Sequence, residues 1–96
     1  MALAVYNQAY FGIHLTTYNI FGQQCDYGDM APNSGPWYLT SGTCADYSGM
    51  FTIRAQGTPS DGVPIDVSQN MTGVAGDHSA TFQRASNGGW RWEYHY

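Results

Sequence analysis

The sequence is short of charge, and above all of positive charge. It has no lysine, and its three arginines (Arg54, Arg84 and Arg91) stand against seven acidic residues, which gives a net charge of −4. Charged residues make up 10% of the chain, whereas an average soluble domain has roughly 25%. This balance argues against a nucleic-acid partner and against an anionic membrane surface, because both are bound mainly through Lys and Arg contacts with phosphate.

Helical patterns and long apolar runs are missing as well. Leucine occurs only at Leu3, Leu15 and Leu39, and 12 glycines and 4 prolines interrupt every window in which apolar residues could recur at helical spacing. No run approaches the ~18 apolar residues of a membrane span, and the first residues lack the charged and apolar regions of a signal peptide. We therefore expect a single β domain over residues 1–96, because 96 residues are too few for two independent cores.

Short stretches in which apolar and polar residues alternate predict β-strands instead. Strands are expected over residues 2–7, 12–20, 36–41, 49–56, 63–68, 77–84 and 89–96. Seven short strands at this spacing are typical of a small antiparallel β-sandwich or barrel. The glycine- and proline-containing segment 21–35 is expected to form the longest loop, and Asn87-Gly88 predicts a type I′ hairpin turn.

The two cysteines, Cys25 and Cys44, predict one disulfide, and the alternative is a pair of reduced, partly buried thiols. The disulfide would close a loop of about 20 residues, which is worth about 3 kcal/mol in the chain-entropy model. Two thiols and scattered histidines do not make a zinc site, and no EF-hand pattern is present, so we expect no metal and no cofactor. A disulfide, an acidic surface and the glycosylation sequon at Asn70-Met71-Thr72 favour an extracellular protein.

The C-terminal segment 89–96 separates its aromatic rings from its ionisable groups. In a strand the rings of Trp90, Trp92, Tyr94 and Tyr96 would lie on one face, and Arg91, Glu93 and His95 on the other. The rings should be buried, because burying the three ionisable groups instead would cost more. The exposed groups form either a surface ion pair with a bystander histidine or a binding and acid–base surface. In the second case a small metal-independent hydrolase or nuclease could use them as base, acid and phosphate clamp.

A second candidate surface lies in the aromatic and amide-rich segment in the middle of the chain. It comprises Tyr27, Asn33, Trp37, Tyr38 and Tyr47, with Asp26, Asp29 and Asp46 among them. Neutral sugars stack their C–H faces on aromatic rings and bond their hydroxyls to amides and carboxylates, which needs little net charge. The alternative is that Trp37 belongs to the core and the tyrosines are ordinary surface residues.

These observations favour a non-enzymatic carbohydrate-binding module or small lectin. The ligand would be a neutral carbohydrate, bound by the central aromatic segment or by Arg91, Glu93 and His95. One alternative is a secreted protein-interaction module (an inhibitor, toxin or effector) that docks through the disulfide-tied loop 21–47, and the other is the small hydrolase. Pairing of two copies through an edge strand is also compatible with the sequence, which does not fix a stoichiometry.

Overall fold

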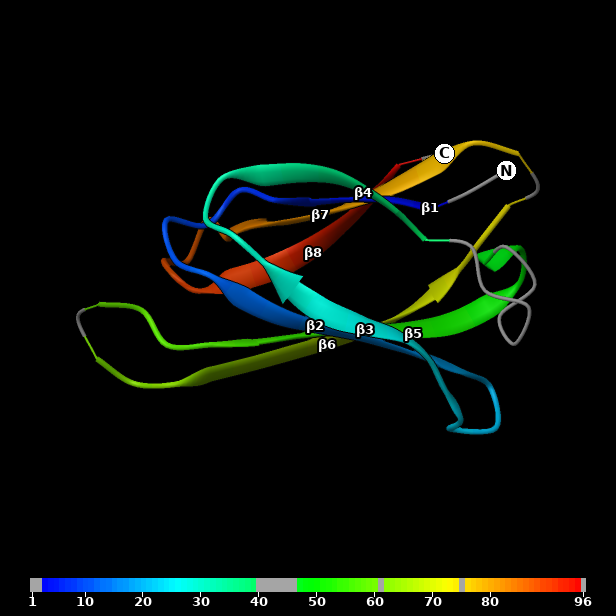
Figure 1. The fold of residues 1–96 in the computed structure, drawn as a ribbon, viewed down its shortest axis with the longest axis horizontal. Helices are drawn as coiled ribbons and strands as arrows, with labels where there is room; N and C mark the ends of the chain where they lie inside the picture. Colours follow the sequence, from blue (N-terminus) through cyan, green and yellow to red (C-terminus); the bar gives the residue numbers. More distant parts are fainter. Residues whose placement is uncertain (1–2, 40–46, 61, 75, 96) are drawn as a thin grey trace.

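The fold is built from strands alone, in a computed structural model that describes residues 3–39, 47–60, 62–74 and 76–95. Within these ranges the chain forms eight strands and no α-helix (Figure 1). The strands are β1 (Leu3–Asn7), β2 (Ile13–Asn19), β3 (Gln24–Met30), β4 (Ser34–Leu39), β5 (Met50–Gly57), β6 (Ile65–Thr72), β7 (His78–Arg84) and β8 (Trp90–His95). No described segment is a helix of the length and apolarity that crossing a membrane would require.

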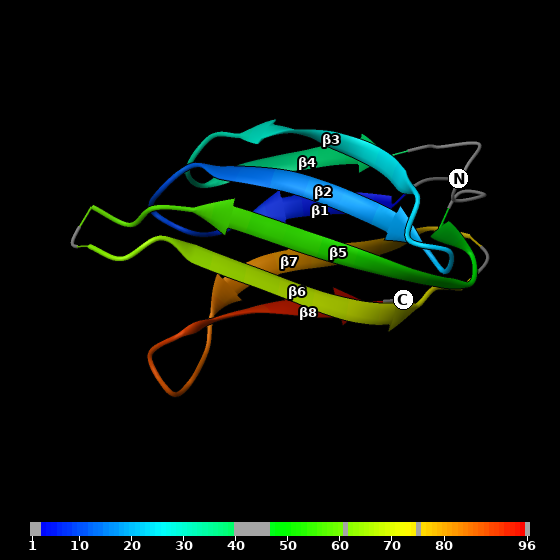
Figure 2. The same cartoon turned by 90° about the horizontal axis from the view of Figure 1, so that it is seen from below.

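The strands form two four-stranded sheets that pack face to face (Figures 1 and 2). The first sheet has the order β4-β1-β7-β8 and the second has the order β3-β2-β5-β6. All described pairings are antiparallel except β1 with β7, which is parallel. The prediction of a small all-β domain with a sandwich-like arrangement is confirmed, with one parallel pair that alternation alone could not reveal.

The core lies between the sheets and follows the alternation along each strand. Leu3 and Val5 of β1, Leu15 of β2, and Ile53 and Ala55 of β5 are fully buried. Because aliphatic residues are few, aromatic rings fill much of the remaining space. They form a cluster in which ring centroids lie 5.0 Å apart for Phe11 and Trp90, 5.6 Å for Phe82 and Trp90, and 5.3 Å for Phe82 and Trp92.

Strand β3 corrects the expectation of a long loop over residues 21–35. Its sequence breaks the usual strand preferences, because Gly28 stands in the middle with aspartates on either side. Gly28 pairs with Leu15, and the indole of Trp37 from β4 occupies the space that a side chain there would need: a Cβ at Gly28 would lie 2.6 Å from Trp37 Cη2. At the opposite edge, Trp92 Nε1 of β8 donates a hydrogen bond to the Val67 carbonyl of β6 at 3.1 Å. A tryptophan therefore bridges the two sheets at each open edge.

The remaining differences concern strand ends and one turn. Strand β6 ends at Thr72, beyond the expected limit of residue 68. The β7–β8 hairpin forms where it was predicted, but only Gly88 has a positive φ (90°), whereas a type I′ turn needs two such residues. Asn87 instead accepts a hydrogen bond through Oδ1 from the Gly89 amide at 3.0 Å. The predicted disulfide cannot be placed, because Cys44 lies outside the described residues, as do Asp46 and Tyr96.

Candidate functional site

The alternation predicted for the C-terminal strand is present in β8. Trp92 is buried, whereas Arg91 and His95 are exposed. Between them, Glu93 accepts hydrogen bonds from Arg91 Nη2 at 3.1 Å and from Gln83 Nε2 at 3.0 Å, and its second oxygen lies 3.4 Å from His95 Nε2. On the exposed face of β8, Arg91 and His95 are thus both paired with Glu93.

This pairing limits the chemistry that Glu93 can perform. Partial burial raises the pKa of its carboxyl, but the hydrogen bond from Gln83 and the charges of Arg91 and His95 outweigh that effect and hold the pKa below its usual value. A carboxylate that stays ionised is a poor general acid. Of the other histidines, His14 lies on the second sheet and the buried His78 bonds through Nδ1 to the Tyr94 hydroxyl. His78 and His95 do line one shallow hollow of about 300 Å³, and within the described ranges no His, Cys, Asp or Glu cluster of metal-binding size occurs.

Tyr47 is buried, whereas the sequence predicted that it lies on the ligand-binding surface. Its side chain is 1% exposed, and its ring packs against Phe51 at a centroid distance of 5.1 Å. Its hydroxyl donates to the Asp26 carboxylate and lies 2.8 Å from Thr17 Oγ1. Burial, reinforced by the bond to Asp26, raises the pKa of Tyr47 above its ordinary value. Tyr47 therefore holds the sandwich together and cannot stack on a ligand.

The other central aromatic residues are distributed over different parts of the molecule. Trp37 is half-buried against Gly28 at the sandwich edge. Tyr38 is exposed on β4, in the first sheet, and Asn33 lies in the β3–β4 turn with a φ of 49°. Only Tyr27 lies on the outer face of the second sheet, where its ring centroid is 6.4 Å from that of His14. The structure therefore does not bring the predicted sugar-binding residues together.

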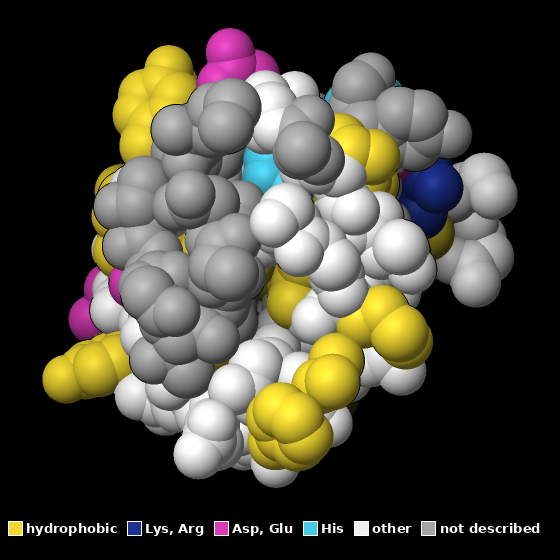
Figure 3. Space-filling view, turned by 90° about the vertical axis from the view of Figure 1, so that its right-hand side faces the viewer, with side chains coloured by type: hydrophobic (Ala, Val, Ile, Leu, Met, Phe, Trp, Pro, Cys, Tyr) yellow, Lys and Arg dark blue, Asp and Glu magenta, His cyan; other side chains and the backbone are white. Residues whose placement is uncertain are grey.

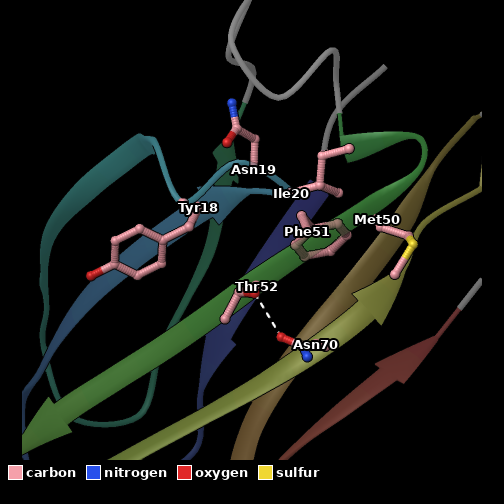
Figure 4. Close-up of a pocket in the computed structure, with 8 residues that line it drawn as sticks. Tyr18, Asn19, Ile20, Met50, Phe51, Thr52 and Asn70 are labelled. Atoms are coloured by element: carbon pink, nitrogen blue, oxygen red, sulfur yellow. Dashed lines mark hydrogen bonds between the residues drawn. The ribbon is translucent and has the colours of Figure 1, made fainter.

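A different set of residues forms a groove on the outer face of the second sheet. Tyr18 of β2 pairs with Thr52 of β5, and Thr52 pairs with Asn70 of β6, so the three side chains form one row across three neighbouring strands. We call it the Tyr18–Asn70 row. Figure 4 shows Thr52 and Asn70 pointing toward each other, and Thr52 Oγ1 donates to Asn70 Oδ1 at 2.7 Å. Among the described residues, the Asn70 amide nitrogen has no acceptor, so it can donate to a ligand.

The β2–β3 hairpin gives the groove its depth. The hairpin turns away from the sheet at the right-hand end of the molecule in Figure 1. Two hairpin residues, Ile20 and Gly22, line the groove together with Met50. The cavity measures about 330 Å³, which is at the lower end of the range of about 300–1,000 Å³ for small-molecule sites. The groove thus has apolar lining from Ile20 and Met50 and polar lining from Thr52 and Asn70, and the Tyr18 ring, which points away from these two polar side chains, lies at its margin (Figure 4).

A charged pair beside the row holds Tyr18 in place. Arg54 donates two hydrogen bonds to the Asp66 carboxylate, from Nε to Oδ1 at 2.8 Å and from Nη2 to Oδ2 at 2.5 Å. Its Nη1 also donates to the Tyr18 hydroxyl at 3.4 Å. The bond from Arg54 lowers the pKa of Asp66, and the bonds to Asp66 and Tyr18 raise that of Arg54. Arg54 and Asp66 are therefore both ionised at neutral pH, and their opposite charges cancel. The groove thus has no net charge to attract an ion.

Sequence reasoning missed this groove, although part of its signal was present. The alternation in residues 12–20 and 49–56 already places Tyr18 and Thr52 on the side away from the core. The register that joins them to Asn70 is non-local, and only the structure supplies it. Comparison with known proteins adds no relative: no family model, no curated protein and no solved structure matches the chain.

Proposed function

We propose that the protein is a non-enzymatic carbohydrate-binding module and that the groove over the Tyr18–Asn70 row binds a neutral sugar. The observation that carries this proposal is the composition of the groove: an anchored aromatic ring, a hydroxyl and an amide, with no uncompensated charge. A pyranose presents the complementary surface, because it has apolar C–H groups on one side and uncharged hydroxyls around its edge.

The polar part of the groove suits recognition of a sugar hydroxyl. Asn70 accepts from Thr52 through its oxygen, which orients the amide nitrogen as a donor. The Thr52 oxygen has lone-pair capacity left to accept from the same ligand hydroxyl. One hydroxyl could thus both donate and accept at the centre of the row, and a ligand group without a hydrogen-bonding atom would leave these partners unsatisfied.

Two further features are proposed alongside this function. A Cys25–Cys44 disulfide would restrain β3, which carries Cys25, and it would agree with an extracellular location, where glycans are accessible. The groove then requires that the sequon at Asn70 carries no glycan, because attachment would use the same side-chain nitrogen. The paired charges of β8 remain a candidate for hydrolytic chemistry, for which loss of turnover in His95→Ala would be the test. We favour the groove because Glu93 is already engaged by Gln83 and Arg91.

Isothermal titration against a panel of neutral mono- and oligosaccharides tests the proposal. We expect at least one sugar to bind, and Asn70→Ala to weaken that binding by about tenfold, because a lost hydrogen bond is worth about 1–1.5 kcal/mol. Gln69→Ala is the matched control, since it removes an exposed amide from the neighbouring position of β6, outside the row.

The proposal fails if no sugar on the panel binds. It fails equally if a sugar binds but Asn70→Ala and Gln69→Ala have the same affinity for it as the unmodified protein.

A further inference from the structure

The β2–β3 hairpin presents large apolar side chains to solvent. Ile20 is 64% exposed and Phe21 is 80% exposed at the hairpin tip, and Met50 at the start of β5 is 63% exposed. Ile20 and Met50 line the same cavity, so the three residues lie at one end of the molecule. Figure 3 shows apolar side chains at the lower edge of this end. We call Ile20, Phe21 and Met50 the apolar tip.

The hairpin is held firmly, so this exposure does not reflect a loose loop. The Asn19 side chain accepts hydrogen bonds from the Phe21 amide at 2.9 Å and the Gln23 amide at 3.0 Å, and it donates to Gln23 Oε1 at 2.9 Å. Backbone bonds close the turn from Asn19 N to Gln23 O at 2.9 Å and from Gly22 N to Asn19 O at 3.0 Å. Gly22 takes a φ of 78°, which favours glycine. The fold thus fixes Ile20 and Phe21 in an outward position.

The size of the apolar tip argues against a folded protein as its partner. Three partly exposed side chains of this kind offer about 300–400 Å² of apolar surface, whereas each partner in a stable protein interface buries roughly 800 Å². A second copy of the chain would meet the same limit. A lipid interface has no such requirement, because a few apolar side chains gain free energy simply by entering the boundary between headgroups and acyl chains.

The charges around the apolar tip specify which lipid surface it suits. Residues 18–24 carry no charged side chain, and the chain as a whole has a net charge of −4. Arg54 is engaged with Asp66, and Arg84 and Arg91 lie at the β7–β8 hairpin of the other sheet. Anionic headgroups would therefore find no basic partner at this end and would repel the protein. The complementary surface is one with uncharged or zwitterionic headgroups.

We propose that the apolar tip inserts into the interface of a zwitterionic lipid surface, with Phe21 entering first and Ile20 and Met50 following. The insertion leaves the sandwich folded and outside the bilayer, because only side chains at the hairpin and at the start of β5 take part. Ile20 and Met50 also line the groove, so insertion and sugar binding share these two side chains, whereas Phe21 does not line the cavity and tests the insertion separately.

Co-sedimentation with phosphatidylcholine vesicles tests the insertion. The unmodified protein should bind these vesicles, and Phe21→Ala should lower the partition coefficient by about tenfold or more. Val63→Ala is the matched control, because Val63 is 79% exposed near the β5–β6 turn, away from the apolar tip, and its removal should leave binding unchanged. Replacing a third of the lipid with phosphatidylserine should weaken binding. Bromine atoms on the acyl chains should quench the emission of a Phe21→Trp variant.

Several outcomes would overturn the inference. Absence of vesicle binding would do so, as would equal binding by Phe21→Ala and the unmodified protein, or binding that requires phosphatidylserine. Concentration-dependent association in lipid-free solution that Phe21→Ala abolishes would assign the apolar tip to a protein contact. Circular dichroism of Phe21→Ala confirms folding, which a change at so exposed a position should not disturb.

Discussion

Removal of a single oxygen atom from the core, by the substitution Tyr47→Phe, should destabilise the sandwich. The aromatic ring remains, so its packing against Phe51 is retained, and only the hydroxyl between Thr17 and Asp26 is lost. Thr17 keeps a partner, since the Asp26 amide donates to its Oγ1 at 3.0 Å. Asp26 loses a donor to its carboxylate but is only partly buried, so water can reach it.

The expected loss of unfolding free energy at pH 7 is about 1–3 kcal/mol, the usual cost of removing a hydrogen bond to a charged group. In a domain of this size, each kilocalorie lowers the melting temperature by about 4–8 °C. Urea unfolding followed by circular dichroism measures the difference. Tyr38→Phe is the control, because the Tyr38 side chain is exposed and its hydroxyl should contribute little.

The pH dependence of the unfolding free energy gives a second, independent test of the same hydroxyl. Burial and the bond to Asp26 raise the pKa of Tyr47 in the folded protein above the ordinary 10.0. Above pH 10 the unfolded chain therefore releases this proton while the folded protein keeps it. The stabilisation is fully present below pH 10 and declines above it, by up to about 1.4 kcal/mol per pH unit. Tyr47→Phe should lack this component. The reasoning is refuted if Tyr47→Phe matches the unmodified protein at pH 7, or if both decline equally between pH 9 and pH 11.

Two further substitutions test the edge contact and the charged pair. Gly28→Ala should lower stability by about 1–3 kcal/mol, because the added Cβ would lie 2.6 Å from the indole of Trp37. Thermal unfolding should show little change for Gly12→Ala, where the nearest atom is 3.4 Å away, and an equal effect at both positions would contradict the packing argument. Asp66→Asn removes a carboxylate whose pKa Arg54 lowers. Its destabilising effect should be fully present at pH 6 and shrink as the pH falls below 3.8, where the unmodified protein also loses that charge. A urea midpoint difference that is constant with pH would exclude this linkage.

The all-β class and the orientation of β8 could be predicted because both depend on local alternation. Trp92 faces the core and Arg91 faces solvent, as the pattern indicates. These features need only the two-residue period of a strand and the preference of rings for the interior.

The missed strand and the buried tyrosine depend on contacts between distant parts of the chain. Gly28 is unfavourable in an isolated strand, and it becomes suitable only because Trp37 from the opposite sheet covers it. Tyr47 looks like a surface residue in a glycine-rich segment, and it is buried because Thr17 and Asp26 provide partners for its hydroxyl. Neither contact could be inferred from neighbouring residues.

The groove likewise combines features that follow from local alternation with features that depend on contacts between distant parts of the chain. Strand periodicity is enough to turn Tyr18 and Thr52 outward, but the pairing of β5 with β6 brings Asn70 beside them. The hairpin geometry that raises Ile20 over the row is set by the Asn19 side chain. A one-residue change of register would have placed Asn70 on the other face of its strand.

The central claim is that a neutral sugar binds on the Tyr18–Asn70 row. A ¹H–¹⁵N titration with a neutral sugar that binds the protein tests it most directly, because the side-chain amide of Asn70 gives its own signals. We predict that these signals and the backbone amide of Thr52 shift with a common dissociation constant, while the side-chain amide of Asn33 does not move. Shifts confined to Arg91, Glu93 and His95, or none at the Asn70 side chain at a saturating sugar concentration, would contradict the account.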